Sequence, residues 1–189
     1  MTAEDRVRWD TYFRSRAHDP YPDPDPLLLQ FTPPAVGEMR ALDLCGGLGQ
    51  NGLWLAEQGY TVDIMDISRV ALNRARVEMT LRNLRSVNLL QVDVDELQLE
   101  LATYDLVCVF RYLQRELFPQ IARAVRPGGR VIYETFHVGY LESVPNFNRA
   151  FLLERGELRQ QFVGWRRLYD EETDQIARLV AVKPTALLS

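Results

Sequence analysis

The chain has 189 residues, of which 47% are hydrophobic and 25% are charged, and its formal net charge is −4. This composition is typical of a soluble globular protein and excludes a disordered or fibrous one, and a chain of this length buries about 70% of its unfolded surface. The negative charge also argues against nucleic acid as a partner, because nucleic acid binds basic patches. We therefore expect one globular domain over residues 1–189.

The cysteines and the apolar segments exclude further classes. Cys45 and Cys108 lie in apolar segments, and neither belongs to a C-x-x-C pair, so a disulfide scaffold and a bound metal are not expected. The first residues, MTAEDRVRWD, are charged, and no apolar stretch reaches the roughly 18 residues that a membrane span needs. These features favour a cytoplasmic protein that does not contact a membrane.

Prolines divide the first 36 residues. A helix is predicted from Ala3 to Arg16, and it must end before the segment HDPYPDPDP, from His18 to Pro26, because prolines two residues apart cannot lie inside a helix. This segment is predicted to be an extended linker. A second short helix is predicted from Leu27 to Phe31, before the sequence Thr32-Pro33-Pro34.

Strand-like and helix-like segments alternate between residues 37 and 136. Short apolar segments of strand length occupy residues 41–45, 61–66, 87–93, 104–110 and 129–136. Between them, apolar residues recur at helical spacing over 50–58, 68–82 and 114–125. Such alternation indicates an α/β fold, in which a doubly wound, Rossmann-like parallel sheet is covered by helices on both faces.

The last part of the chain has a different pattern. Residues 162–170 and 175–184 are strand-like and too close together for a crossover helix, so they are predicted to form an antiparallel hairpin at the sheet edge. The sheet is then mixed, with about seven strands. The preceding residues, 137–163, include a helical pattern over 149–162. This insertion follows a strand end, where α/β proteins form their binding crevice, so we expect it to help cover the site.

The strongest local signal is the sequence ALDLCGGLGQNG, Ala41 to Gly52, which predicts a strand, a glycine-rich turn and a helix. It also satisfies G-x-G-x-x-G, which leaves a dinucleotide-dependent oxidoreductase open as an alternative. However, Asp43 places a carboxylate at the turn, where it would repel a pyrophosphate. A ligand with cationic amino and sulfonium groups would be attracted instead.

From Arg40 to Phe136 the sequence resembles the class I S-adenosylmethionine-dependent methyltransferases. LDLCGGLGQN is similar to their first motif, VDIMDIS to their ribose motif and LLQVDVDEL to their adenine motif. YDLVCVF and AVRPGGRVIYETF are similar to their fourth strand and to the turn into the fifth. WDTYF and FNRAFLLERGEL further resemble the branch of tellurite-resistance and thiopurine methyltransferases. The resemblance implies S-adenosylmethionine as cofactor.

The resemblance also divides the chain by role. Residues 1–36 correspond to helices and a linker that cover the cofactor in this branch, although Trp9, Tyr12 and Phe13 could equally be ordinary packing residues. Residues 37–136 correspond to the cofactor-binding core, 137–163 to an acceptor-side insertion and 164–189 to the C-terminal hairpin.

The cofactor-binding residues follow from the motifs. Asp66 is expected to accept hydrogen bonds from the ribose hydroxyls, and Asp93 and the amide of Val94 are expected to bind the adenine. For both aspartates a helix-capping role is the alternative. The full predicted set is Asp43, Cys45, Gly46, Gly47, Gly49, Asp66, Ile67, Asp93, Val94, Phe110, Arg111 and Tyr12. Arg111 could instead form a surface ion pair.

Cys45 departs from the family pattern, because it occupies the first glycine position. We expect the thiol to be tolerated if the backbone there does not need a positive φ. Reactive cysteines need an electropositive environment, and Asp43 supplies the opposite. Neither Cys45 nor Cys108 is therefore expected to take part in catalysis.

The acceptor side is less defined. His137 follows the fifth strand, and an imidazole there could act as a catalytic base, although a solvated loop histidine is the alternative. If Arg111, Arg115 and Arg155 join His137 in a cationic mouth, the acceptor is anionic. Pairing of these arginines with Glu116, Glu154 and Glu157 is the alternative.

The sequence thus predicts an enzyme that transfers a methyl group from S-adenosylmethionine to a small-molecule acceptor by in-line displacement. An NAD(P)-dependent oxidoreductase and a non-catalytic cofactor-binding module are the alternatives. The sequence determines neither the acceptor nor the oligomeric state.

Overall fold

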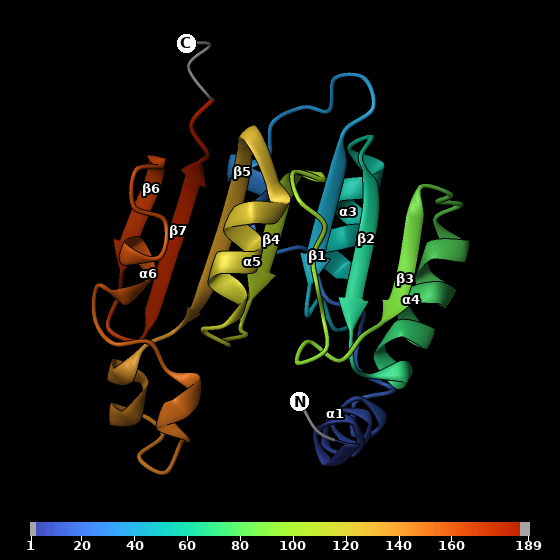
Figure 1. Ribbon diagram of the computed structural model, residues 1–189. Coiled ribbons are helices and arrows are strands. Elements are labelled where there is room, and N and C mark those ends of the chain that lie inside the picture. Colours follow the sequence, from blue (N-terminus) through green and yellow to red (C-terminus); the bar gives the residue numbers. More distant parts are fainter. Residues whose placement is uncertain (1–2, 186–189) are drawn as a thin grey trace. The chain divides into compact units, whose positions relative to one another are not determined.

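The computed structural model describes residues 3–185, which belong to two compact units, one ending at Gln98 and the other beginning at Leu99. The first unit holds three parallel strands in the order β3-β2-β1. Its helices α3 and α4 pack on these strands, as Figure 1 shows. In chain order its elements are α1 (Ala3–Ser15), α2 (Pro26–Phe31), β1 (Arg40–Leu44), α3 (Gln50–Glu57), β2 (Thr61–Asp66), α4 (Arg69–Leu81) and β3 (Val87–Gln91).

The core of the first unit explains why these segments are strands. Apolar side chains of the strands and of α3 are fully buried together. They are Leu42 and Leu44 of β1, Ile64 of β2, and Leu53 and Leu55 of α3. Near-continuous apolar strands of this kind belong to parallel sheets whose faces are covered by helices.

The second unit holds four strands in the order β4-β5-β7-β6. β4 and β5 are parallel, whereas β7 runs antiparallel to both β5 and β6. Its elements are β4 (Tyr104–Phe110), α5 (Leu117–Ala124), β5 (Val125–Phe136), the 3-10 helices η1 (Val138–Glu142) and η2 (Arg149–Phe151), α6 (Glu157–Gln160), β6 (Arg166–Glu172) and β7 (Ile176–Val182).

The predicted fold is confirmed. The described residues form seven strands with mixed pairing, and the last two make the predicted antiparallel hairpin of a Rossmann-like fold. The division of residues 1–189 by role stays a prediction, and residues 1–2 and 186–189 lie outside the described part. Among residues 3–185, no helix is both long and apolar enough to cross a membrane.

The predicted helix over 149–162 is wrong. The chain forms a short 3-10 helix and then pairs with the end of β5, where the Leu153 amide donates to the Phe136 carbonyl at 3.1 Å and the Val138 amide to the Leu153 carbonyl at 2.8 Å. Gly156 then takes a left-handed φ of 74°, and only Glu157–Gln160 is α-helical. Backbone pairing with a distant segment therefore replaces a local helical pattern.

Candidate functional site

The glycine turn between β1 and α3 is held in shape by its own backbone. The Gly49 amide donates to the Gly46 carbonyl at 2.8 Å, and the Leu53 amide starts α3 by donating to the Gly49 carbonyl at 2.8 Å. Gly47 and Gly49 have φ values of 56° and 78°, which side chains rarely adopt. The predicted strand, turn and helix are therefore present, with glycine where the backbone requires it.

Asp43 lies beneath this turn. Its side chain is 1% exposed, and Oδ2 accepts a hydrogen bond from the Gly52 amide at 2.9 Å. A Cβ atom on Gly46 would lie only 2.6 Å from the Asp43 carboxylate carbon. The carboxylate therefore supports both the turn and the start of α3, and it requires glycine at position 46.

Cys45 contradicts the expectation about its backbone. Its φ is 56°, so the first glycine position does require left-handed backbone, and a cysteine adopts it at an energetic cost. Burial raises the pKa of the Cys45 thiol well above its ordinary value, and the negative charges of Asp66 and Asp43 raise it further. The thiol stays protonated near neutral pH, which makes it a poor nucleophile.

Asp66 ends β2 and connects two loops. Its Oδ2 accepts from the Gly47 amide and its Oδ1 from the Ser68 amide, both at 2.8 Å. Burial raises the pKa of this carboxyl, although the two hydrogen bonds oppose the shift. The residue that caps α4 is Ser68, whose hydroxyl accepts from the Ala71 amide at 3.1 Å. Since a carboxylate has about four lone-pair sites, Asp66 retains capacity for ribose hydroxyls.

The predicted ribose residue Asp66 ends β2, and the predicted adenine residues follow the end of the adjacent strand β3. The Val92 amide donates to the Asp66 carbonyl at 3.0 Å, which extends the pairing of β2 and β3 up to the predicted adenine residues. Asp93 uses Oδ1 to accept from the Asp95 amide at 3.0 Å, so it caps a turn, and no helix of the described residues begins here as the helix-capping alternative requires. Val94 is buried, and so is Ile67, next to Asp66.

Helix α1 contacts the same loops through residues that the sequence did not single out. The Asp10 carboxylate accepts from the Ser68 hydroxyl at 2.7 Å and from the Val70 amide at 3.2 Å. Burial alone would raise the pKa of Asp10, but these bonds and nearby arginines lower it. Phe13 lies against the glycine turn, because a Cβ atom on Gly47 would be 3.2 Å from its ring.

The aromatic residues of α1 form one cluster, in which Tyr12 is the outermost. Tyr12 is 42% exposed, its ring lies 5.2 Å from that of Phe13, and the Arg16 guanidinium stacks on it at 3.9 Å. The structure therefore places Phe13, and not Tyr12, against Gly47. The spacing of Trp9, Tyr12 and Phe13 predicted a shared face but not which ring reaches the turn. No side chain of residues 4–15 is buried, so α1 is not a core helix.

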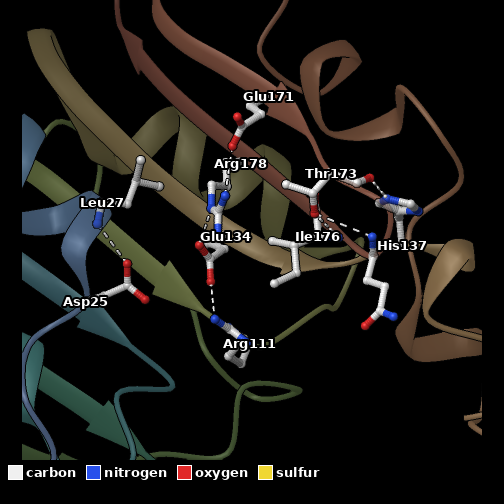
Figure 2. Close-up of polar contacts among 10 residues, drawn as sticks. Asp25, Leu27, Arg111, Glu134, His137, Glu171, Thr173, Ile176 and Arg178 are labelled. Carbon is white, nitrogen blue, oxygen red and sulfur yellow. Dashed lines mark hydrogen bonds and ion pairs between the residues drawn. The ribbon is translucent and has the colours of Figure 1, made fainter. Parts of the chain in front are cut away.

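In the second unit, Arg111 follows β4 and turns toward β5. Its φ is 59°, its amide donates to the Glu134 carbonyl at 2.8 Å, and its guanidinium pairs with the Glu134 carboxylate at 2.5 Å. Figure 2 shows Glu134 between Arg111 and Arg178, whose Nε lies 2.6 Å away. Arg178 also pairs with Glu171 at 2.8 Å. Phe110, the last residue of β4, is half-buried.

Glu134 is a residue that sequence reasoning missed. It is 2% exposed, although it is charged. The available signal was its place inside the apolar strand GRVIYETF, because a buried carboxylate needs a cation or several donors. Arg111 thus forms an ion pair, as the alternative to a cofactor contact predicted, but its partner Glu134 is buried and does not lie on the surface.

His137 does not have the geometry of a catalytic base. Its side chain is fully buried; Nδ1 accepts from the Gly139 amide and Nε2 lies 3.0 Å from the Thr173 carbonyl, to which it can only donate. Both ring nitrogens are therefore used by the backbone, as Figure 2 shows for Thr173. The structure therefore gives no support to the predicted base role, which stays a prediction, because both ring nitrogens already have backbone partners in this conformation.

The predicted cationic mouth is largely neutralised. Arg115 pairs with Glu157 at 2.6 Å and donates to the Leu152 carbonyl at 3.0 Å, and Arg111 is paired with Glu134. These contacts match the alternative of ion pairing for Arg115. Among the described residues, no three His, Cys, Asp or Glu side chains are grouped as a metal site would require.

Comparison with known proteins agrees with this geometry. Residues 41–129 match the family model of a methyltransferase domain. The matched residues include the glycine turn, Asp66 and Asp93, and the match supports a methyltransferase domain in this part of the chain. No curated protein sequence matches the chain significantly.

Solved structures share the fold. An S-adenosylmethionine-dependent methyltransferase from Mesorhizobium loti is 21% identical, with a TM-score of 0.68 over 84% of this chain and 96% of its own. A structure described as "Conversion of a Disulfide Bond into a Thioacetal Group during Echinomycin Biosynthesis" is 18% identical, with a TM-score of 0.73 over 97% and 94%.

A phosphoethanolamine N-methyltransferase 2 from Haemonchus contortus, in complex with S-adenosyl-L-methionine, is 17% identical, with a TM-score of 0.70 over 95% of this chain and 57% of its own. At these identities the likeness concerns the fold. Together with the family match, it supports an S-adenosylmethionine-dependent methyltransferase and the predicted cofactor.

Proposed function

We propose that the protein transfers a methyl group from S-adenosylmethionine to a small-molecule acceptor. The observation that carries the proposal is the glycine turn of the first unit, whose left-handed Gly47 is bound by Asp66 and faces Phe13. A Cβ atom at Gly47 would lie 3.2 Å from the Phe13 ring and crowd it. The bare glycine backbone can approach a ligand closely, and Asp66 at the end of β2 lies beside it.

The residues of the first unit divide the binding between them. The glycine turn would face the methionine part, with the Asp43 carboxylate below it attracting the cationic groups. Asp66 would accept from the ribose hydroxyls through its remaining lone pairs, and Asp93 and Val94 would bind the adenine. Ile67 and Cys45 would contact the cofactor between its methionine part and its adenine. For Tyr12, Phe110 and Arg111 a contact with the cofactor is also part of the proposal.

When bound, the cofactor supplies an electrophilic methyl group: the acceptor's lone pair bonds to the methyl carbon as the carbon–sulfur bond breaks and leaves neutral S-adenosylhomocysteine. The protein then has to align the acceptor and exclude water, and alignment alone can supply about 7–11 kcal/mol. Because both nitrogens of His137 are occupied, the proposal includes no dedicated base.

The proposal assigns no charge to the acceptor, because Arg111 and Arg115 are already paired with carboxylates. The similarity of WDTYF to the tellurite-resistance and thiopurine branch makes oxyanions and thiols the first acceptors to test. A cytoplasmic location stays a prediction. The same fold could serve an oxidoreductase or a non-catalytic module, but neither explains the carboxylate of Asp43 beneath the turn together with the family match.

Thermal unfolding tests the cofactor and turnover tests the activity. S-adenosylhomocysteine at 100 times its dissociation constant should stabilise the protein by about 2.7 kcal/mol, which is about 5–10 °C in melting temperature for a domain of this size. NADH should have no comparable effect, and the reverse result would support the oxidoreductase. Release of S-adenosylhomocysteine in an acceptor screen separates an enzyme from a binding module.

A further inference from the structure

The proline-rich linker between α1 and α2 is anchored to the cofactor-binding side of the first unit. Arg74 of α4 donates to the Asp19 carbonyl at 3.0 Å, and the Arg82 guanidinium lies 5.5 Å from the centre of the Tyr21 ring. Further along, the Asp25 amide donates to the buried side chain of Asn51 in α3 at 2.8 Å. The linker therefore has a fixed position on the first unit, because residues of α3 and of α4 with its C-cap bind it.

Tyr21 connects this linker to the glycine turn. Its hydroxyl donates a short hydrogen bond to the carbonyl of Leu48, 27 residues away in sequence. Burial raises the pKa of the Tyr21 hydroxyl, so it stays protonated and remains a donor at any physiological pH. The prolines on both sides of Tyr21 restrict the backbone, which lowers the entropy lost when the hydroxyl is held in place.

The bond fixes one peptide plane. The Leu48 carbonyl and the Gly49 amide belong to the same peptide group; Tyr21 binds the carbonyl, and the Gly46 carbonyl accepts from the amide at 2.8 Å. Leu48 and Gly49 flank this group, and Gly49 lets the group rotate at a lower steric cost than a residue with a side chain would. Without the hydroxyl, the plane is held at one end only.

We propose that Tyr21 is a positioning residue for cofactor binding: its hydroxyl holds the glycine turn in the binding conformation without touching the cofactor. The inference rests on the proposed function. When only a fraction of molecules has the binding conformation, the apparent dissociation constant rises by the inverse of that fraction. Since an ordinary hydrogen bond contributes modestly to stability, Tyr21→Phe should weaken S-adenosylhomocysteine binding about three- to tenfold.

Tyr60→Phe is the matched control. The Tyr60 hydroxyl also donates to a carbonyl 27 residues away, that of Pro33, at 2.8 Å, and Tyr60 is fully buried. It precedes β2, whereas the cofactor residue Asp66 ends that strand. Both variants lose one tyrosine-to-carbonyl hydrogen bond, but only Tyr21→Phe loosens the glycine turn.

The experiment measures S-adenosylhomocysteine affinity by calorimetric titration and exchange of the Gly49 amide by NMR in the ligand-free proteins. Tyr21→Phe should weaken binding three- to tenfold and speed Gly49 exchange by a similar factor, while Tyr60→Phe changes only the melting temperature. Unchanged affinity and exchange in Tyr21→Phe, or equal losses in Tyr60→Phe, would overturn the proposal. If the unmodified protein binds no S-adenosylhomocysteine, the proposed function fails, and Gly49 exchange alone then decides the role of Tyr21.

Discussion

Two buried carboxylates near strand ends, one in each unit, are satisfied by opposite kinds of partner. Asp66, at the end of β2, is 8% exposed and accepts from two backbone amides. Glu134, in β5, is 2% exposed and lies between the guanidinium groups of Arg111 and Arg178. The sequence presents both simply as acids in apolar strands.

The difference in partners gives the two carboxylates different capacities. Amide dipoles carry no net charge, so burial still raises the pKa of Asp66, and its remaining lone pairs can attract a hydroxyl donor. Glu134 is neutralised by cations, and its hydrogen bond is the main reason that the pKa of Arg178 is raised. A carboxylate held by amides can thus bind a ligand, whereas one held by two arginines stabilises the fold.

The largest expected effect is the loss of stability in Glu134→Gln. The substitution removes the negative charge between Arg111 and Arg178. We expect a loss of about 2–3 kcal/mol, which is below the value for a fully buried pair because both guanidinium groups reach solvent. Chemical denaturation measures it, and S-adenosylhomocysteine affinity in the folded variant should be nearly unchanged. A large loss of affinity with normal stability would make Glu134 a binding residue and remove the contrast with Asp66.

The next effect concerns His137, whose role we expect to be structural like that of Glu134. His137→Ala leaves the Gly139 amide and the Thr173 carbonyl without their partner, which should cost about 2 kcal/mol of stability. Once an acceptor is known, the pH dependence of the transfer rate should not change. A loss of rate by one or two orders of magnitude, with normal stability and cofactor binding, would restore the base role.

Asp66→Ala should affect binding more than stability. The substitution removes the acceptor proposed for two ribose hydroxyls, so S-adenosylhomocysteine affinity should fall at least about tenfold in calorimetric titration. Asp63→Ala is the control, because Asp63 is also buried on β2 but pairs with Arg40 at 2.8 Å and accepts from Asn88. That variant should lose stability and keep its affinity. Unchanged affinity in folded Asp66→Ala would remove Asp66 from the site.

The smallest expected effect is a pH dependence that comes from Asp66. As the pH falls, the stability of the protein should rise and its affinity for S-adenosylhomocysteine should fall. The folded-state pKa of Asp66 is raised above the ordinary value of 3.8, so the folded protein holds this proton more tightly than the unfolded chain. Protonation of Asp66 therefore adds to stability as the pH falls through the raised pKa toward 3.8. Over the same window, S-adenosylhomocysteine affinity should fall about two- to tenfold, because a protonated carboxyl is a weaker acceptor.

Asp66→Asn separates this effect from other titrations. Asparagine has a similar size but no proton to gain, so the variant should lose the part of both pH dependences that belongs to position 66. Affinity and stability are measured in the same buffers for both proteins. Parallel pH profiles of the two proteins would contradict the assignment to Asp66.

The sequence by itself determined the elements and the nature of the first unit's turn. Apolar spacing is a local property, so it predicted β2 and β4 with the bounds that the structure has, and the first five α-helices to within a few residues. It failed over 149–162, where pairing with β5 replaces the helix. The glycines after Asp43 predicted the sharp turn, because only glycine adopts left-handed backbone freely. The cofactor family followed from motifs that lie within short stretches of chain.

Only the tertiary structure decided which partners the polar groups have. Tyr21 reaches Leu48, 27 residues away, Arg178 reaches Glu134, 44 residues away, and the ring of His137 lies against Thr173, 36 residues away. No local spacing encodes such pairs, because they depend on how strands and loops are brought together. Whether a carboxylate or an imidazole is free for chemistry depends on these distant partners, and so its residue type alone does not determine its role.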